Sequence, residues 1–361
     1  MSFTWDPDIN QTYTENFGDR VIPRDDFDKS LGCSFTMDAP GCELTLKVNR
    51  GSGKAFMWPV KADFSAAKKT NINVQRGRLV ISHEQWEEFG IDANVCENGN
   101  LANVTVSDGA IFKIENINIE THNGSTPCEW DISGGLIMNG GGCSSPSKFN
   151  IKGHGYWELN QPYVNLSGDV VIDSSPISES GYSCLINTRT FRLYGIQFVE
   201  SYGSFLVRGS SKVKISINKL SDSEVESNND ISGWISLQDN SRLTFSSDQA
   251  NAQLNIMGGF QLKPGTTELY FGEAGKFCPI VLDVSDVKTG RYKGVFNFIS
   301  HRPGDNRGSL IFMNPPDNFL NLLIGGDYIT INGDAAYYKE QYLASRLKVD
   351  GINAIVVALK Q

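Results

Sequence analysis

The chain has 361 residues, 40% of them hydrophobic and 20% charged, and its net charge is −9. This composition is typical of a folded protein and argues against disorder. The acidic balance argues against a nucleic-acid partner, because a basic face that neutralises phosphates provides most non-specific affinity. No apolar run reaches the roughly 18 residues that a transmembrane helix needs, so we expect no membrane insertion.

The composition favours β-structure. The chain contains 36 Gly, 20 Phe and 12 Tyr, with abundant Ser, Asn, Ile and Val. Aromatic and β-branched residues suit the half-buried surface of a sheet, and Gly, Asn and Ser suit tight turns. We therefore predict an all-β protein.

Residues 1–100 are predicted to form an N-terminal arm or cap. The segment 1–30 is acidic and without periodicity, and short strands follow from Gly41. One short helix is expected at 83–89, because Ser82 and Gln85 form a capping box. The first residues lack the basic and apolar regions of a signal peptide, so we expect folding in a cytoplasm or earlier removal of a leader.

Residues 101–294 carry a repeated pattern. The phrase at 203–215, with apolar residues two apart, a turn, a Ser and apolar residues two apart again, recurs at 233–245 and, with a longer turn, at 258–271. A looser copy lies at 104–114. The period of two places the apolar side chains on one face of two short strands. Such a unit must stack on a neighbour to bury that face, which predicts a β-solenoid.

The alternative is an antiparallel β-sandwich. Several Asp-Gly and Asn-Gly dipeptides, including those at Asp108, Asn139, Asn332 and Asp350, are typical of β-hairpins. The recurrence of one phrase at spacings of about 25 to 30 residues favours the solenoid.

Residues 295–361 depart from the repeat. Strands are expected at 295–298, 310–312 and 328–331, and a helix at about 335–347, with Asp334 as its N-cap. A solenoid needs its last rung covered, so we predict an α+β C-terminal cap or a subunit interface.

The phrases Ser210–Ile215 and Asn240–Phe245 resemble the rungs of right-handed parallel β-helix proteins, notably phage tail spikes and autotransporter passenger domains. The resemblance covers about residues 100–330. It implies an elongated, surface-exposed protein that binds cells or polysaccharide, located on a virion or a cell surface. It also implies a homotrimer or contacts with other virion proteins.

Two segments are candidate ligand sites. The segment 154–163 contains His154, Tyr156, Trp157 and Tyr163, and an aromatic face can cover a pyranose while polar groups orient it. Trp157 could equally pack in the core. The loop 301–307 is rich in hydrogen-bond donors and is the second candidate, with His301, Arg302, Asp305 and Arg307.

Catalysis is the alternative to binding. Glycoside cleavage needs two carboxylates about 5 to 9.5 Å apart. Glu158, Asp169 and Asp173 are the candidates, but Asp169 and Asp173 stand roughly 13 Å apart if they share one strand. No metal-binding spacing, nucleotide-binding motif or nucleophile elbow occurs, so we expect no metal and no cofactor.

The seven cysteines form no Cys-x-x-Cys motif. Cys33 and Cys42 could close a small loop in an oxidising compartment, but we favour free thiols. The sequence therefore predicts a non-enzymatic protein that binds cell-surface glycan, such as a tail-spike component or adhesin. The alternatives are a polysaccharide-degrading β-helix enzyme and a structural virion or assembly protein.

Overall fold

A computed structural model describes the protein at residues 2–25, 27–30, 32–49, 56–57, 70–83, 92–96, 102–121, 129–145, 148–194, 204–218, 229–250, 252–282, 288–290 and 292–360. These residues are mainly β-strand with very little helix, so the protein is all-β, as the composition predicts. The chain forms two compact units. The first comprises Met1–Val170 with Ser174–Cys184, and the second comprises Val171–Asp173 with Leu185–Gln361. β15 (Val170–Ser174) and β16 (Cys184–Leu193) contribute residues to both.

The described residues of the first unit include fourteen strands and a short 3-10 helix, η1 (Glu15–Phe17). The strands are β1 (Gln11–Thr14), β2 (Arg20–Arg24), β3 (Phe35–Val48), β4 (Phe56–Met57), β5 (Thr70–His83), β6 (Asp92–Cys96), β7 (Ala102–Val106), β8 (Ile111–Glu115), β9 (Asn118–Thr121), β10 (Glu129–Ile132), β11 (Gly135–Asn139), β12 (Cys143–Ser145), β13 (Lys148–Gly153) and β14 (Tyr156–Leu166).

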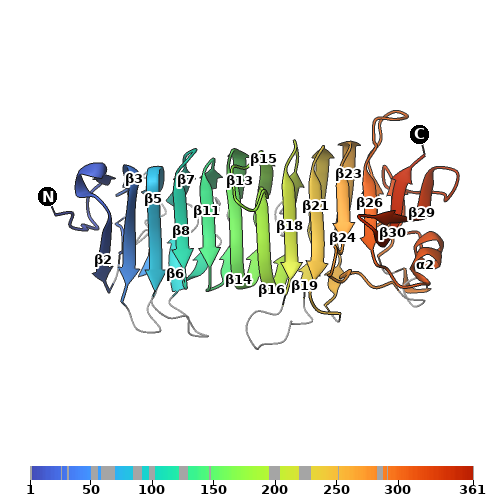
Figure 1. The fold of residues 1–361 in the computed structure, drawn as a ribbon, viewed down its shortest axis with the longest axis horizontal. Helices are drawn as coiled ribbons and strands as arrows, with labels where there is room; N and C mark the ends of the chain where they lie inside the picture. Colours follow the sequence, from blue (N-terminus) through green and yellow to red (C-terminus); the bar gives the residue numbers. More distant parts are fainter. Residues whose placement is uncertain are drawn as a thin grey trace. The chain divides into compact units, whose positions relative to one another are not determined.

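These strands pair in parallel, in three ladders. One ladder runs from β1 through β3, β5, β7 and β10 to β13, and the second from β2 through β3, β5, β8 and β11 to β14 (Figure 1). The third joins β4, β6, β9, β12 and the end of β14. The long strands β3, β5 and β14 bend and take part in two ladders each. The parallel pairing thus begins at residue 11, within the segment expected to be an irregular arm.

The core of the first unit is filled by side chains that alternate along each strand, because successive residues of a strand face opposite sides. Phe112, Trp130, Phe149 and Trp157 are fully buried there. Their rings follow one another, and those of Phe149 and Trp157 stack with centroids 4.4 Å apart. Each such ring contributes roughly 1.5–3 kcal/mol by burial.

The second unit contains β17 (Ser204–Val207), β18 (Lys212–Ile217), β19 (Asn229–Ile231), β20 (Trp234–Asp239), β21 (Arg242–Ser247), β22 (Leu254–Ile256), β23 (Gly259–Gly265), β24 (Glu268–Phe271), β25 (Phe296–Phe298), β26 (Ser309–Met313), α2 (Phe319–Gly325), β27 (Ile329–Ile331), β28 (Asp334–Ala335), β29 (Tyr342–Val349) and β30 (Ile352–Leu359). Parallel pairs again join successive copies. β17 pairs with β20 and β20 with β23, while β18 pairs with β21 and β21 with β24.

The register confirms the sequence repeat residue by residue. Phe205 pairs with Ile235 and Ile235 with Phe260, while Val213 pairs with Leu243 and Leu243 with Leu269. The longer turn of the third copy is absorbed by a register shift that places Asp239 opposite Gly265. The turn serine of the second copy, Ser241, is fully buried and bonds both its own turn and the neighbouring copy.

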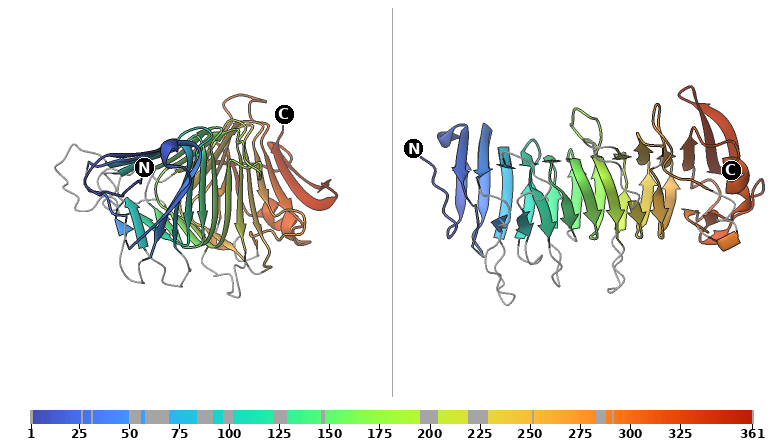
Figure 2. Two further views of the ribbon diagram at one scale, coloured as in Figure 1. Left: turned by 60° about the vertical axis from the view of Figure 1, so that its left-hand side comes forward. Right: turned by 90° about the horizontal axis from the view of Figure 1, so that it is seen from below.

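Among the strand pairs with a described register, antiparallel pairing, which a β-sandwich requires, occurs in β26–β30, β27–β28 and β29–β30, and all the others are parallel. An isolated antiparallel bridge also joins Ser247 to Phe277. Figure 2 shows this C-terminal part of the second unit in red. The dipeptides Asn332-Gly333 and Asp350-Gly351 form its hairpin turns with positive φ, as their type suggests. Asp108-Gly109 and Asn139-Gly140 instead join strands that pair in parallel with other copies.

The predicted helix at 335–347 is wrong. Residues 342–349 form β29, in which buried Tyr342 and Ala344 alternate with exposed residues, a period of two. Lys339 has a positive φ, which a right-handed helix does not allow, so no helix runs through this residue into the strand. The second unit contains α2, which packs Phe319 against Phe312. The other predicted helix, at 83–89, lies outside the described residues after His83, the last residue of β5.

Candidate functional site

One outward face of the first unit brings together residues from five neighbouring strands. It belongs to the ladder β3–β5–β8–β11–β14, whose register aligns Glu43, Arg78, Ile111, Gly135 and Tyr156 in one row. The residue that follows an outward residue along its strand, such as Leu44 after Glu43, points into the core. The outward row is therefore fixed by the same alternation that builds the interior.

Tyr156 lies against the backbone of Gly135 in the preceding strand. A Cβ on Gly135 would stand 2.5 Å from the Tyr156 hydroxyl oxygen and 2.6 Å from Cζ, so only glycine leaves room for the ring. Burial raises the pKa of Tyr156, and the positive charge of Arg78 acts in the opposite direction. The ring is half-buried and reaches toward the Arg78 side of the row.

An open pocket of about 510 Å³ adjoins this row at the corner of β3 and β5. The corner is tight, because Gly77 has a φ of +85° and a Cβ there would stand 2.2 Å from the Ala39 carbonyl oxygen. Its lining is Asp19, Pro40, Gly41, Cys42, Glu43, Arg76, Gly77, Arg78, Asp108, Gly109 and Ile111. Ile111, which lines the pocket, pairs with Gly135, and the Tyr156 ring rests on Gly135.

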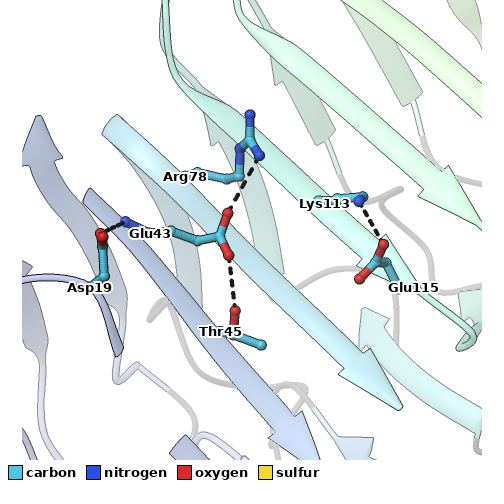
Figure 3. Close-up of polar contacts among 6 residues, drawn as sticks. All are labelled: Asp19, Glu43, Thr45, Arg78, Lys113 and Glu115. Carbon is cyan, nitrogen blue, oxygen red and sulfur yellow. Dashed lines mark hydrogen bonds and ion pairs between the residues drawn. The ribbon is translucent and has the colours of Figure 1, made fainter. Parts of the chain in front are cut away.

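The charged groups of the pocket are held in pairs. Arg78 Nη1 lies 3.4 Å from Glu43 Oε2, and Glu43 also accepts a hydrogen bond of 3.3 Å from the Thr45 hydroxyl (Figure 3). The Glu43 backbone N–H donates to Asp19 Oδ1 over 2.8 Å. Further along the same face, Lys113 and Glu115 form an ion pair of 2.6 Å. Fixed pairs of this kind offer both donors and acceptors to a polar ligand.

A second arginine–carboxylate pair joins Arg76 to Asp38. The hydrogen bond from Arg76 holds the pKa of Asp38 below its ordinary value, so this carboxylate stays ionised. The side chain of Arg76 is 58% exposed. Arg76 and Arg78 are therefore both accessible to a ligand without a conformational change.

His154 and Glu158 lie close to this face, as part of the predicted segment 154–163. His154 Nδ1 is 3.0 Å from Asp108 Oδ2, and Asp108 lines the pocket. Glu158 follows Tyr156 on the same outward side of β14 and accepts a hydrogen bond of 2.8 Å from the Ser180 hydroxyl. His154, Tyr156 and Glu158 are therefore brought to one region.

Trp157 and Tyr163 are not part of that region. Trp157 points inward, is fully buried and stacks on Phe149, which is the core alternative left open by the sequence. Tyr163 follows the bend of β14, where this strand changes its partner from β11 to β12. Its ring lies against Gly142, which immediately precedes β12 of the third ladder. The two tyrosines thus make the same contact with glycine on different faces.

The other candidate carboxylates have separate environments. Asp173, in the second unit, forms an ion pair of 2.9 Å with Arg208. Asp169, in the first unit, precedes β15, and its carbonyl oxygen accepts the Phe149 N–H. Glu158 is held by Ser180. None of these contacts pairs one candidate carboxylate with another.

The loop 301–307 belongs to the second unit and is strongly preorganised. Burial acts to raise the pKa of Asp305, but hydrogen bonds from the Ser300 hydroxyl and from the backbone N–H groups of His301 and Arg302 outweigh it and lower the pKa. Asp305 therefore holds the loop. His301, Arg302 and Arg307 are exposed.

The pocket residues were missed by the sequence prediction. Arg76 and Arg78 are visible in the sequence as a sparse basic stretch, and Glu43 and Asp108 lie in predicted strand and turn segments. Only the pairing register places Glu43 beside Arg78, although they are far apart in the chain. A single sequence carries no direct signal for that register.

Five cysteines within the described residues, including Cys33 and Cys42, are free thiols. Burial raises the pKa of Cys143 and of Cys278 to about 12, so these thiols stay protonated. The described part of the chain contains no group of three His, Cys, Asp or Glu side chains placed to hold a metal ion. None of its helices is long and apolar enough to span a bilayer.

No protein-family model matches this sequence, and comparisons with curated proteins and with solved structures give no match either.

Proposed function

We propose that the protein is a right-handed parallel β-helix that binds glycan on a cell surface without cleaving it, as a virion component or adhesin. The in-register parallel pairing of successive sequence copies supports the β-helix, because stacked rungs require that pairing. We also propose that the protein is located on a virion or a cell surface.

The observation that carries the binding site is the position of Tyr156. Its ring rests on Gly135, next to an open pocket whose charged groups are already paired. An aromatic surface covers the apolar face of a sugar ring, while donors and acceptors at its edge orient the hydroxyl groups. Tyr156 supplies the first element, and Arg78, Glu43 and Asp108 supply the second.

The preorganisation of the site favours binding. Glu43 is fixed by Arg78 and Thr45 before any ligand arrives, so little side-chain entropy remains to be lost. The paired charges also suit a neutral or weakly charged sugar, because a ligand hydroxyl can donate to a carboxylate and accept from the neighbouring guanidinium. A strongly anionic ligand would meet Asp19, Glu43 and Asp108 as well as the arginines.

A glycan array probed with the full chain tests the proposal, followed by an assay for new reducing ends on each oligosaccharide that binds. We expect binding to a restricted set of glycans and no increase in reducing ends. Absence of binding across bacterial and animal surface glycans would contradict the proposal. New reducing ends would replace it with the polysaccharide-degrading alternative.

A further inference from the structure

The second unit carries a partly exposed tryptophan that lies over a glycine of the next strand. Trp234 is the first residue of β20 and pairs with Gly259, the first residue of β23. A Cβ on Gly259 would stand 2.7 Å from Trp234 Cζ3, so the indole occupies the place of a Gly259 side chain. Trp234 nevertheless remains 38% exposed. The indole is therefore fixed in position and accessible from solvent.

Trp234 points outward because it alternates with core residues along its strand. The next residue of β20, Ile235, is fully buried, and so is Phe260, which follows Gly259 in β23. Successive side chains of a strand face opposite sides, so Ser236 and Gln261 lie on the same outward face as the indole. Their positions are two residues, or roughly 7 Å, further along the two strands. A ring the size of a pyranose that stacks on the indole can reach them.

The row of side chains beside Trp234 is polar, uncharged and held by hydrogen bonds. Ser236 Oγ donates to Gln261 Oε1 over 3.2 Å, which leaves Gln261 Nε2 to donate to a ligand. Asn297 follows Gln261 in register, and its Oδ1 accepts the Gly333 N–H over 3.0 Å. Both amide groups are thus oriented before a ligand arrives, and little side-chain entropy remains to be lost on binding.

Two further apolar side chains are exposed at the corner that precedes Trp234. The N–H groups of Ser232 and Met257 each donate to the preceding copy, which places Tyr194, Ser232 and Met257 in neighbouring positions of successive copies. Tyr194 is 39% exposed and Met257 is 68% exposed. Apolar side chains that gather on one surface, bordered by polar groups, are typical of a binding site. Three of them are few for a protein interface, which uses about 20–30 residues on each side, but suffice for a sugar.

We propose that Trp234, Gly259 and Gln261 form a second carbohydrate-binding surface, which takes a neutral sugar. The indole covers the apolar face of a pyranose, and Gln261 Nε2 donates to a hydroxyl group at the edge of that ring. A neutral ligand is favoured because the row beside the indole is uncharged, and the next outward side chain of β23, Lys263, lies two residues beyond Gln261. This surface belongs to the second unit, shares no residue with the Tyr156 face and does not depend on glycan binding there.

Ligand-observed saturation-transfer NMR tests the surface, with tetrasaccharides of glucose, galactose, mannose and N-acetylglucosamine. One stacked sugar with one or two hydrogen bonds corresponds to a Kd of about 0.1–1 mM, which this method detects. The full chain is used as Tyr156→Ala, which removes the other proposed site. We expect saturation transfer to at least one tetrasaccharide, a loss of at least about fivefold when Trp234→Ala is added, and partial recovery with Trp234→Phe. Gly259→Ala should also weaken binding, because its methyl group displaces the indole.

A glutamine pair controls for the hydrogen bond. Gln261→Ala should raise the Kd at least about threefold, because it removes the donor beside the indole. Gln253→Ala, at an exposed position just before β22, should leave the Kd unchanged. Equal affinities of these two variants would overturn the role of Gln261 in the proposal.

Two further results would overturn the proposal as a whole. The first is no saturation transfer to any of the four sugars in Tyr156→Ala, or equal transfer with and without Trp234→Ala. The second is a larger sedimentation coefficient for the wild type than for Trp234→Ala, which would assign the surface to a contact between copies of the chain. Trp234→Ala alone reports on the Tyr156 face, so the failure of one site is distinguishable from the failure of the other.

Discussion

The Tyr156 ring occupies the space that a side chain on Gly135 would fill, and the two residues pair directly in adjacent parallel strands. This contact fixes an aromatic surface beside the pocket at the β3–β5 corner. It also explains the glycine at the start of β11, where a side chain would meet the tyrosine ring.

Gly135→Ala should displace the Tyr156 ring, because the new methyl group would stand 2.5 Å from the hydroxyl oxygen. We expect a loss of about 1–2 kcal/mol in the free energy of unfolding. In a protein that already carries Tyr156→Ala, the Gly135→Ala substitution should cost little unfolding free energy. Urea unfolding of the four proteins of this cycle gives the coupling energy, and strictly additive losses would show that the two residues do not interact.

Ser241→Ala should destabilise the second unit. The buried hydroxyl donates to the Val207 carbonyl over 3.0 Å and accepts the Gln238 N–H over 3.1 Å. Removal leaves two backbone groups without a partner, at a cost of about 1–3 kcal/mol. The exposed Ser210→Ala in the corresponding turn should change the free energy of unfolding by less than about 0.5 kcal/mol. Equal losses in the two variants would refute this role of Ser241.

Lys29 anchors the N-terminal segment of the first unit. It is fully buried, donates to the carbonyl oxygens of Asp6 and Ile9 and lies over the Trp5 ring. Burial lowers its pKa from 10.5 to about 8. Between these values the unfolded chain holds a proton that the folded chain has lost, so the Lys29 contribution to stability rises with pH.

The difference in unfolding free energy between the wild type and Lys29→Met isolates that contribution. We expect it to be constant below about pH 8 and to grow in favour of the wild type toward pH 10.5. The comparison is needed because buried tyrosines and cysteines with raised pKa values act in the opposite direction. A difference that stays flat over this range would contradict a depressed Lys29 pKa.

Asn306 holds the loop 301–307 from inside. Its Nδ2 donates to the carbonyl oxygens of Leu262 and Ile299. In Asn306→Asp a carboxylate would face these oxygens, and its pKa should rise above that of the unfolded chain. The variant should therefore lose stability as pH increases through about 4 to 7, whereas the exposed Asn314→Asp should not. Thermal unfolding at several pH values makes the comparison.

The repeat was predictable because each copy, taken alone, shows both the apolar period of two and the hydroxyl residue after the turn. Phe205, Ile235 and Phe260 could be aligned from the sequence, and they pair in that order. The segment 335–347 was mistaken for a helix because Ala335, Ala336 and Leu343 favour helices. The pairing of β29 with β30, which decides the conformation of residues 342–349, is not a local property.

The site was predictable only in part. His154, Tyr156 and Glu158 stand out because aromatic and polar residues cluster in a short segment. Their partners Asp108, Gly135 and Ser180 come from other copies or loops and depend on the register. The sequence also could not decide whether Trp157 faces in or out, because a shift of one residue reverses the faces of a strand.

The central claim is that the Tyr156 face binds glycan. Calorimetry with the best-binding oligosaccharide from the array, on the wild type, Tyr156→Ala and Tyr163→Ala, tests it most directly. Both tyrosines rest on glycine, but only the glycine beneath Tyr156 pairs with a residue that lines the pocket, Ile111. We predict at least a tenfold weaker Kd for Tyr156→Ala, about 1.4 kcal/mol, and an unchanged Kd for Tyr163→Ala. Equal affinities for the wild type and Tyr156→Ala would contradict the claim.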